Sequence, residues 1–198
     1  MKPGRFFRLT SSSASRWLTL LVILLFPGVS HGRESRAVDF SLQNWDGQTV
    51  TLTSLQGKVV LLAFSYAFCS VSCPVITGRL SSLDRVLDSP TGIRYLHVSI
   101  DPEMDTQKRR QDYFDLYKID AQKDRRWMFV SGKREDLAVL WTEYGIDIEK
   151  VKEKRLPEGY YMKYSPKLLL IDGNGLISLE TDFYFDEEEL KSTVEALL

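Results

Sequence analysis

The chain has 198 residues, of which 43% are hydrophobic and 27% are charged. This length and apolar content predict one domain with a sizeable core, and they exclude wholesale disorder and collagen-like repeats. Of the 26 basic side chains, four (Lys2, Arg5, Arg8 and Arg16) lie in residues 1–32, which hold no acidic one; the other 22 stand against 27 acidic side chains. Because an acidic surplus repels polyphosphate, we expect no nucleic-acid partner.

Residues 1–32 have the features of an export signal. A basic, Ser-rich stretch precedes an apolar run from Trp17 to Phe26, and small residues such as Ser30 and Gly32 follow. That order is typical of a secretory signal peptide, and a run of about ten residues is half of the ~20 that a membrane span needs. We expect a signal peptide or N-terminal membrane anchor at 1–32, with no other membrane contact, and one domain at 33–198. The expected location is the periplasm or the outer face of the inner membrane, with the mitochondrial inner membrane as an alternative; the cysteines then meet an oxidising compartment.

From residue 33 onward, the sequence alternates between strand and helix patterns. We expect strands at 39–42, 48–52, 59–64, 93–100, 127–130, 168–171 and 176–179. Helical patterns follow the cysteines up to Ser89-Pro90, run from Thr106 to about Tyr117 and from Glu135 to Tyr144, and begin again after Asp186. The run 59–64 is wholly apolar, as expected of a parallel strand buried on both faces.

Local signals refine these elements. Turn residues at Asp46-Gly47 and at 173–175 predict two hairpins. Asp105-Thr106 is the expected cap of the second helix, whose apolar stripe is Tyr113, Leu116 and Tyr117, and Asp186 is the expected cap of the last helix. The charged segment 148–158 is predicted to be an exposed loop. A β-α-β half followed by a β-β-α half predicts an α/β three-layer sandwich of thioredoxin type with a mixed sheet.

The chain's two cysteines lie in Cys69-Ser70-Val71-Ser72-Cys73-Pro74, where the buried strand ends and a helix begins. On one helix face, a spacing of four puts side chains ~5–6 Å apart, close enough for a disulfide, and a helix N-terminus lowers the pKa of a thiol. We expect Cys69 to be the exposed attacking sulfur and Cys73 the resolving one. The same two sulfurs are candidate ligands for Cu(I) or Zn(II). An inert structural disulfide is the remaining alternative.

Four segments resemble, in the same order, motifs of the Sco/SenC proteins. They are the CxxxCP motif from Cys69 to Pro74, the segment from His97 to Thr106, the stretch from Trp127 to Gly145, and the hairpin from Leu170 to Gly175. The resemblance covers most of residues 37–198. It implies a thioredoxin-like fold in an exported or membrane-anchored protein. Such a protein helps to assemble the copper centres of cytochrome c oxidase, as a copper carrier or as a thiol reductant.

The sequence departs from this pattern at one ligand position. The family has a histidine eight residues before the aspartate that is Asp172 here, and it completes a Cys-Cys-His copper site; Tyr164 occupies that position. Of the two histidines in the chain, His31 lies in the leader and His97 in a predicted interior strand. A neutral tyrosine is a poor ligand for a soft metal, and Met162 is a weaker thioether alternative. The chain therefore resembles an atypical Sco/SenC protein that lacks the metal-binding histidine.

Pro166 is a second departure. It stands six residues before Asp172, a spacing that resembles the cis-proline stretch of thioredoxins and exported thioredoxin-like reductases. We expect a cis Ser165–Pro166 bond against the dithiol, which would present the Ser165 backbone to a bound substrate chain. A trans proline that opens an edge strand is the alternative.

These features together predict thiol–disulfide exchange on a protein client, with Cys69, Cys73 and Pro166 as catalytic residues and no cofactor required. A subunit of cytochrome c oxidase is the expected client. The first alternative is a metallochaperone that delivers copper to the oxidase through the two cysteines, and the second is a non-catalytic scaffold with a structural disulfide. Asp101 and Asp105 are expected to serve as turn and cap residues. Arg79 faces either solvent or a thiolate.

Overall fold

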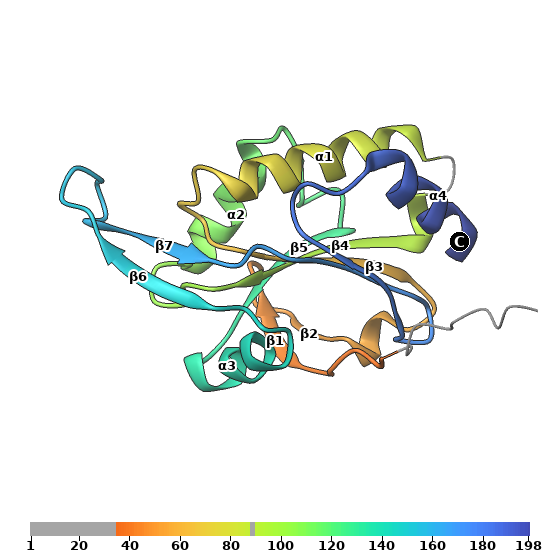
Figure 1. Cartoon of the computed structure of the whole chain (residues 1–198), viewed down its shortest axis with the longest axis horizontal. Helices are drawn as coiled ribbons and strands as arrows, with labels where there is room; N and C mark the ends of the chain where they lie inside the picture. The colour runs from red at the N-terminus through yellow and green to blue at the C-terminus, as the bar shows by residue number, and fades with distance from the viewer. Residues whose placement is uncertain (1–34, 88–89) are drawn as a thin grey trace, which may run out of the picture. The chain divides into compact units, whose positions relative to one another are not determined.

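The computed structural model describes residues 35–87 and 90–198 (Figure 1). The predicted leader at 1–32 lies outside them, and no helix within the described ranges is long and apolar enough to cross a bilayer. The strands are β1 (Ser41–Asn44), β2 (Thr49–Thr51), β3 (Val59–Ser65), β4 (Ile93–Ser99), β5 (Trp127–Ser131), β6 (Ile148–Lys152), β7 (Tyr160–Tyr164), β8 (Leu168–Ile171) and β9 (Ile177–Thr181). The helices are α1 (Ser72–Val86), α2 (Gln107–Asp115), α3 (Arg134–Glu143) and α4 (Glu187–Leu197), with short 3-10 turns η1 (Thr53–Leu55) and η2 (Pro90–Gly92).

Strand β3 lies inside a seven-stranded sheet with the order β2-β1-β5-β4-β3-β8-β9. All seven of its side chains are buried, which explains why its sequence is almost entirely apolar. It pairs in parallel with β4 and antiparallel with β8, and β4 pairs in parallel with β5. The sheet is therefore mixed, as the sequence predicts.

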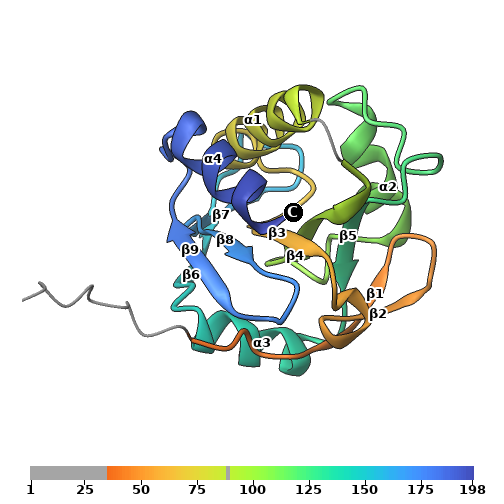
Figure 2. The ribbon, with the colours of Figure 1, turned by 90° about the vertical axis from the view of Figure 1, so that its right-hand side faces the viewer.

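Helices cover both faces of this sheet, so the sheet and the helices together form a three-layer α/β sandwich. Helices α1, α2 and α4 lie on one face and α3 lies on the other (Figures 1 and 2). The hydroxyls of Thr77 and Tyr113, 2.5 Å apart, join α1 to α2. On the opposite face, Trp141 Nε1 of α3 donates a hydrogen bond to the carbonyl oxygen of Ser99 at the end of β4.

Both predicted hairpins and the cap of the last helix are confirmed. Strands β1 and β2 pair antiparallel around Gly47, whose φ of 82° suits a residue without a side chain. Strands β8 and β9 pair in the same way around Gly175. The Asp186 carboxylate accepts a hydrogen bond from Glu189 N, 2.9 Å away, at the start of α4.

The prediction of an exposed loop at 148–158 is wrong for residues 148–152 and confirmed for residues 153–158. Strand β6 occupies its first part and pairs antiparallel with β7, and the two form a separate two-stranded sheet. We call residues 148–164 the β6–β7 arm, which reaches beyond the end of the main sheet in Figure 1. The sequence pattern does not predict β6, because the side chains of this strand are largely exposed and charged. On β7, by contrast, Tyr160, Met162 and Tyr164 alternate with the more exposed Tyr161 and Lys163.

For the second helix, the expected cap is confirmed at Thr106 and wrong at Asp105, and the expected apolar stripe is wrong at Leu116. Thr106 caps α2 by accepting a hydrogen bond from Arg109 N, whereas the Asp105 carboxylate points into the protein. Leu116 is not part of an apolar stripe: it is 73% exposed, because α2 ends at Asp115. Phe114 takes the buried position beside Tyr113.

Candidate functional site

The two cysteines lie where the central strand passes into α1, and they form a disulfide with a Cα–Cα distance of 5.7 Å. Cys73 is the second residue of α1, whereas Cys69 lies in the loop three residues before the helix. The expectation that both sulfurs share a helix face is therefore wrong in detail. The pair still closes, because the loop brings the two Cα atoms within the range that a disulfide requires.

The two sulfurs have different environments. Cys73 is completely buried and Cys69 is half-buried. Cys73 N donates a hydrogen bond to Cys69 Sγ over 3.2 Å. An N–H in the first helical turn has no partner within the helix, and the same donor stabilises a thiolate when the disulfide is reduced. This asymmetry suits Cys69 to the attacking role and Cys73 to the resolving role.

Tyr164 meets the sulfurs from the β6–β7 arm. Its hydroxyl lies 3.3 Å from Cys73 Sγ and 3.0 Å from Ser72 Oγ, and it donates a hydrogen bond to the carbonyl oxygen of Phe64 over 3.1 Å. Burial raises the pKa of Tyr164, so the phenol stays neutral. Tyr164, the residue that the sequence analysis sets apart, thus lies beside the disulfide.

Ser72 is a site residue that the sequence patterns do not single out. Its hydroxyl lies between Tyr164 and Cys69 Sγ, 3.6 Å from the sulfur. A serine in the first turn of a helix is common, so its presence inside the CxxxC motif carries no signal of its own. Its contact with the site appears only in the structure, where the β6–β7 arm places the Tyr164 hydroxyl 3.0 Å from Ser72 Oγ.

A groove of about 400 Å³ opens beside Cys69. Its lining comes from Tyr66, Cys69, Ser70, Val71 and Ser72, from Leu156, Tyr161, Met162, Lys163 and Tyr164 of the β6–β7 arm, and from Pro166 and Phe183. We call it the Cys69 groove. Val71, one of its lining residues, is 71% exposed.

Pro166 lines the Cys69 groove, but the expected cis bond is wrong. Every peptide bond in the described residues is trans, including Ser165–Pro166. The chain passes from β7 to β8 through this proline, whose fixed φ suits an extended connection. The group that meets the Cys73 sulfur is the hydroxyl of Tyr164.

His97 is a neutral histidine of the core, as its place in an interior strand predicts. It is completely buried, and its Nδ1 lies 3.0 Å from Ser65 Oγ. The rings of Tyr113, Phe114 and Phe129 surround it at centroid distances of 5.4, 5.6 and 5.9 Å. Burial lowers the pKa of His97 to about 3. It therefore serves packing rather than metal binding.

Asp105 and Asp101 accept hydrogen bonds from segments that form the site. The buried Asp105 carboxylate accepts hydrogen bonds from Ala67 N at 2.8 Å and Ser99 Oγ at 2.6 Å, and burial raises its pKa to about 7. Asp101 Oδ2 accepts a hydrogen bond from the hydroxyl of Tyr160, 2.5 Å away. One aspartate thus anchors the loop that leads to Cys69, and the other anchors the β6–β7 arm.

Both alternatives for Arg79, solvent or a thiolate, are wrong, because its guanidinium is paired with other protein groups. Its guanidinium donates to Glu187 Oε1 at 2.8 Å and to the carbonyl oxygens of Phe183 and Phe185 at 3.0 and 2.5 Å. It also lies over the Phe185 ring, 4.2 Å from the centroid. Arg79 therefore ties α1 to the segment before α4.

Met162, the thioether that the sequence offers as a weaker ligand, is buried on β7, where it packs with the core.

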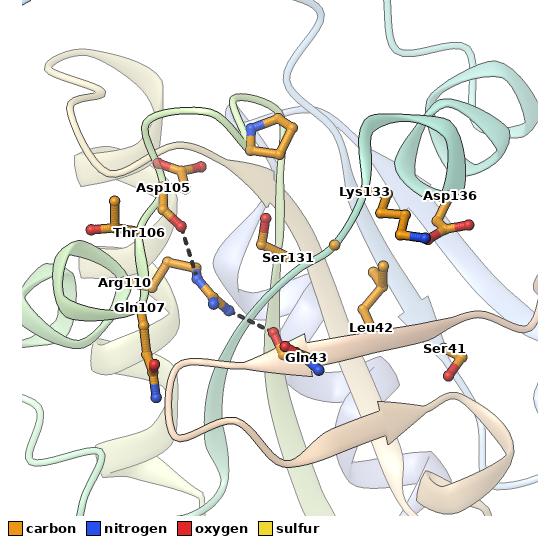
Figure 3. A pocket seen from close by; sticks show the side chains of 12 residues that line it. Ser41, Leu42, Gln43, Asp105, Thr106, Gln107, Arg110, Ser131, Lys133 and Asp136 are labelled. Carbon is orange, nitrogen blue, oxygen red and sulfur yellow. Dashed lines mark hydrogen bonds between the residues drawn. The ribbon is translucent and has the colours of Figure 1, made fainter.

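A second hollow, of about 480 Å³, lies between β1, the start of α2 and the start of α3 (Figure 3). It shares no lining residue with the Cys69 groove. Arg110, the central cation in this hollow, donates to the backbone carbonyls of Asp105, Gln43 and Phe129. Because these bonds hold three segments of the backbone together, we assign Arg110 a structural role.

Comparison with known proteins connects this site to one family. Residues 29–198 match the family model described as SCO1/SenC. The SCO1 protein homolog of Bacillus subtilis is 32% identical over 94 residues, which are 47% of this chain and 47% of that protein, so this chain spans about half the length of that relative.

Solved structures agree with this match. Bradyrhizobium japonicum ScoI with copper bound is 25% identical, with a TM-score of 0.71, and the match covers 83% of this chain and 100% of that chain. BsSco, a member of the Sco family of cytochrome c oxidase assembly proteins with a disulfide switch, has the same fold at 23% identity and a TM-score of 0.65, over 83% of this chain and 94% of that chain. Since the family model spans most of the sequence, the chain belongs to the SCO1/SenC family.

Proposed function

We propose that this protein is a thiol–disulfide oxidoreductase that acts on a protein client through Cys69 and Cys73. The observation that carries the proposal is the arrangement of the two sulfurs. Cys69 is half-buried at the edge of a groove and accepts a helix N–H, while Cys73 lies fully buried behind it. One sulfur can be reached by a client, and the other is held ready to displace that client.

The exchange proceeds in two displacements. The Cys69 thiolate attacks one sulfur of a client disulfide; a new S–S bond forms, the client bond breaks and the other client sulfur leaves as a thiolate. The Cys73 thiolate then attacks Cys69 Sγ, and the second client sulfur leaves. Two electrons pass from the cysteine pair to the client, and the pair becomes the disulfide that the structure contains. A dithiol reductant in the same compartment returns the pair to its reduced state.

The client that we propose is a protein with a cysteine pair destined for a copper site of cytochrome c oxidase. BsSco, which shares this fold, is a member of a family of oxidase assembly proteins. The largely apolar lining of the Cys69 groove suits a polypeptide segment on either side of a client cysteine. The leader-like residues 1–32 support an exported protein, in the periplasm or on the outer face of the inner membrane.

Exchange with oxidised glutathione tests this proposal. The reduced full-length protein should take up one glutathione on Cys69 and then release it as the intramolecular disulfide forms. Cys73→Ser should stop at the mixed disulfide, and Cys69→Ser should remove the fast reaction. A Cys69→Ser protein that reacts as fast as the wild type would contradict the assignment of the attacking sulfur. A disulfide that resists dithiothreitol would favour the non-catalytic scaffold.

Copper delivery is the second candidate, favoured by the structure of Bradyrhizobium japonicum ScoI with copper bound. Copper would be cargo here, and two thiolates are suitable donors for Cu(I). The third group beside them is the neutral phenol of Tyr164, which is a poor soft-metal ligand. In the described ranges, no group of three or more His, Cys, Asp and Glu side chains is placed to hold a metal. The donor set therefore fits two-coordinate Cu(I) and no complete three-ligand site.

Tyr164→His separates the two functions. The substitution places an imidazole at the position that contacts the Cys73 sulfur, so it should raise the Cu(I) affinity of the reduced protein by about tenfold or more over the wild type. Tyr164→Phe is the matched control, because it changes the same side chain without adding a metal ligand. Affinity is measured by competition with a chromophoric Cu(I) chelator. Equal affinities in the wild type and Tyr164→His would instead support copper delivery by the natural chain.

A further inference from the structure

The buried Cys73 sulfur poses a proton-transfer problem that the proposed exchange has to solve. Cys73 must lose its thiol proton to become the nucleophile of the second displacement. Its side chain is completely buried, so bulk water does not reach it. The proton needs a path through protein groups that contact the sulfur at one end and the Cys69 groove at the other.

The hydroxyls of Tyr164 and Ser72 connect the Cys73 sulfur to the Cys69 groove. The Tyr164 hydroxyl lies 3.3 Å from Cys73 Sγ and 3.0 Å from Ser72 Oγ. Ser72 Oγ in turn lies 3.6 Å from Cys69 Sγ, and both Ser72 and Tyr164 line the Cys69 groove. The chain of contacts thus begins at the resolving sulfur and ends beside the attacking sulfur, where the client is bound.

The hydrogen positions in this chain can switch. A carbonyl oxygen only accepts, so the Tyr164 hydrogen points to Phe64 O in the oxidised protein, and the Tyr164 oxygen is free to accept from Ser72. In the mixed disulfide, the Cys73 thiol can donate to the same oxygen. Rotation of the phenolic hydrogen from Phe64 O to Ser72 Oγ then completes a donor–acceptor chain without movement of a heavy atom.

We propose that Tyr164 and Ser72 form a proton relay that deprotonates Cys73 as it attacks Cys69. The Cys73 proton passes to the Tyr164 oxygen, the Tyr164 proton passes to Ser72 Oγ, and the Ser72 proton passes into the Cys69 groove. There, water or the client thiolate released in the first step accepts it. Both hydroxyls end neutral, and the sulfur of Cys73 forms the new bond while the second client sulfur leaves. The same path runs backwards when a client thiol opens the disulfide.

This inference rests on the proposed function, and the two make separate predictions for reduced full-length protein mixed with oxidised glutathione. Acid quenching followed by mass spectrometry resolves two phases, the gain and then the loss of protein-bound glutathione. Tyr164→Phe should leave the first phase unchanged and slow the second about tenfold or more, since it removes the hydroxyl and keeps the ring. The second phase of the wild type should slow about twofold in D2O, and Tyr164→Phe should lose that isotope effect.

Ser72 provides an independent test of the same path. Ser72→Ala should slow the second phase in the same way, and Ser72→Thr, which keeps a hydroxyl, should restore it. Tyr184→Phe is the matched control, because it removes an exposed phenol outside the Cys69 groove. Unchanged second phases in both Tyr164→Phe and Ser72→Ala, or an equal slowing of both phases, would overturn the relay and leave the exchange intact. A wild type that never takes up glutathione would overturn the proposed function itself.

Discussion

Two buried side chains make the stability of the protein depend on pH in opposite directions. Burial lowers the pKa of His97 from 6.5 to about 3, so the unfolded chain binds more protons in that window and the free energy of unfolding rises with pH. Burial raises the pKa of Asp105 from 3.8 to about 7, so the folded protein binds more protons and the free energy of unfolding falls as the pH rises. Each contributes about 1.4 kcal/mol per pH unit within its window. The two contributions oppose each other between pH 3.8 and 6.5.

Single substitutions should separate these opposing contributions. His97→Gln removes the contribution that increases the free energy of unfolding with pH. The free energy of unfolding of this variant should therefore fall relative to that of the wild type as the pH increases from about 4 to 6. Asp105→Asn removes the contribution that decreases the free energy of unfolding with pH, so the free energy of unfolding of this variant should rise relative to that of the wild type over the same range. Denaturant titrations of the oxidised proteins at about pH 4, 5 and 6 measure both, and the slopes of the two variants should differ by about 2.7 kcal/mol per pH unit. Identical slopes in the wild type and both variants would refute the assignment of the two shifted pKa values.

Three further substitutions test the packing around the site. Arg79→Ala removes three hydrogen bonds and the cation over Phe185, so it should cost about 1–2 kcal/mol in a denaturant titration and leave glutathione exchange unchanged; a slower exchange would mean that Arg79 acts on the sulfurs. Leu80→Ala opens a cavity under α1 and should lower the free energy of unfolding by about 2–5 kcal/mol, whereas a loss below about 1 kcal/mol would show that the site collapses. Tyr160→Phe removes the donor to Asp101 and should speed amide hydrogen exchange in the β6–β7 arm, not in β3. Equal protection in both proteins would speak against this anchor.

The parts of the fold that the sequence predicts are those in which burial dictates the residue type. Strand β3 is apolar throughout because both of its faces are covered, and the hairpin at Gly47 is marked by its turn residues. The cysteine motif is visible from its spacing along the chain, whereas the place of Tyr164 at the site is implied only by the resemblance to the Sco/SenC pattern.

What the sequence does not predict depends on contacts between distant segments. Strand β6 exposes its charged side chains, so only its pairing with β7 makes it a strand. Asp105 has the residue type of a cap, but Ala67 N and Ser99 Oγ draw its carboxylate inward. The isomer of the Ser165–Pro166 bond and the role of Ser72 likewise depend on neighbours that no local pattern records.

The group that meets the sulfurs comes from an arm whose two strands pair with each other, apart from the seven-stranded sheet in the described structure. A substitution at position 164 therefore leaves the strand pairing of the main sheet in place, while it changes the group that contacts Phe64 O, Ser72 and Cys73. One substitution on this arm is therefore enough to replace the neutral phenol that contacts the Cys73 sulfur with a side chain of different chemistry.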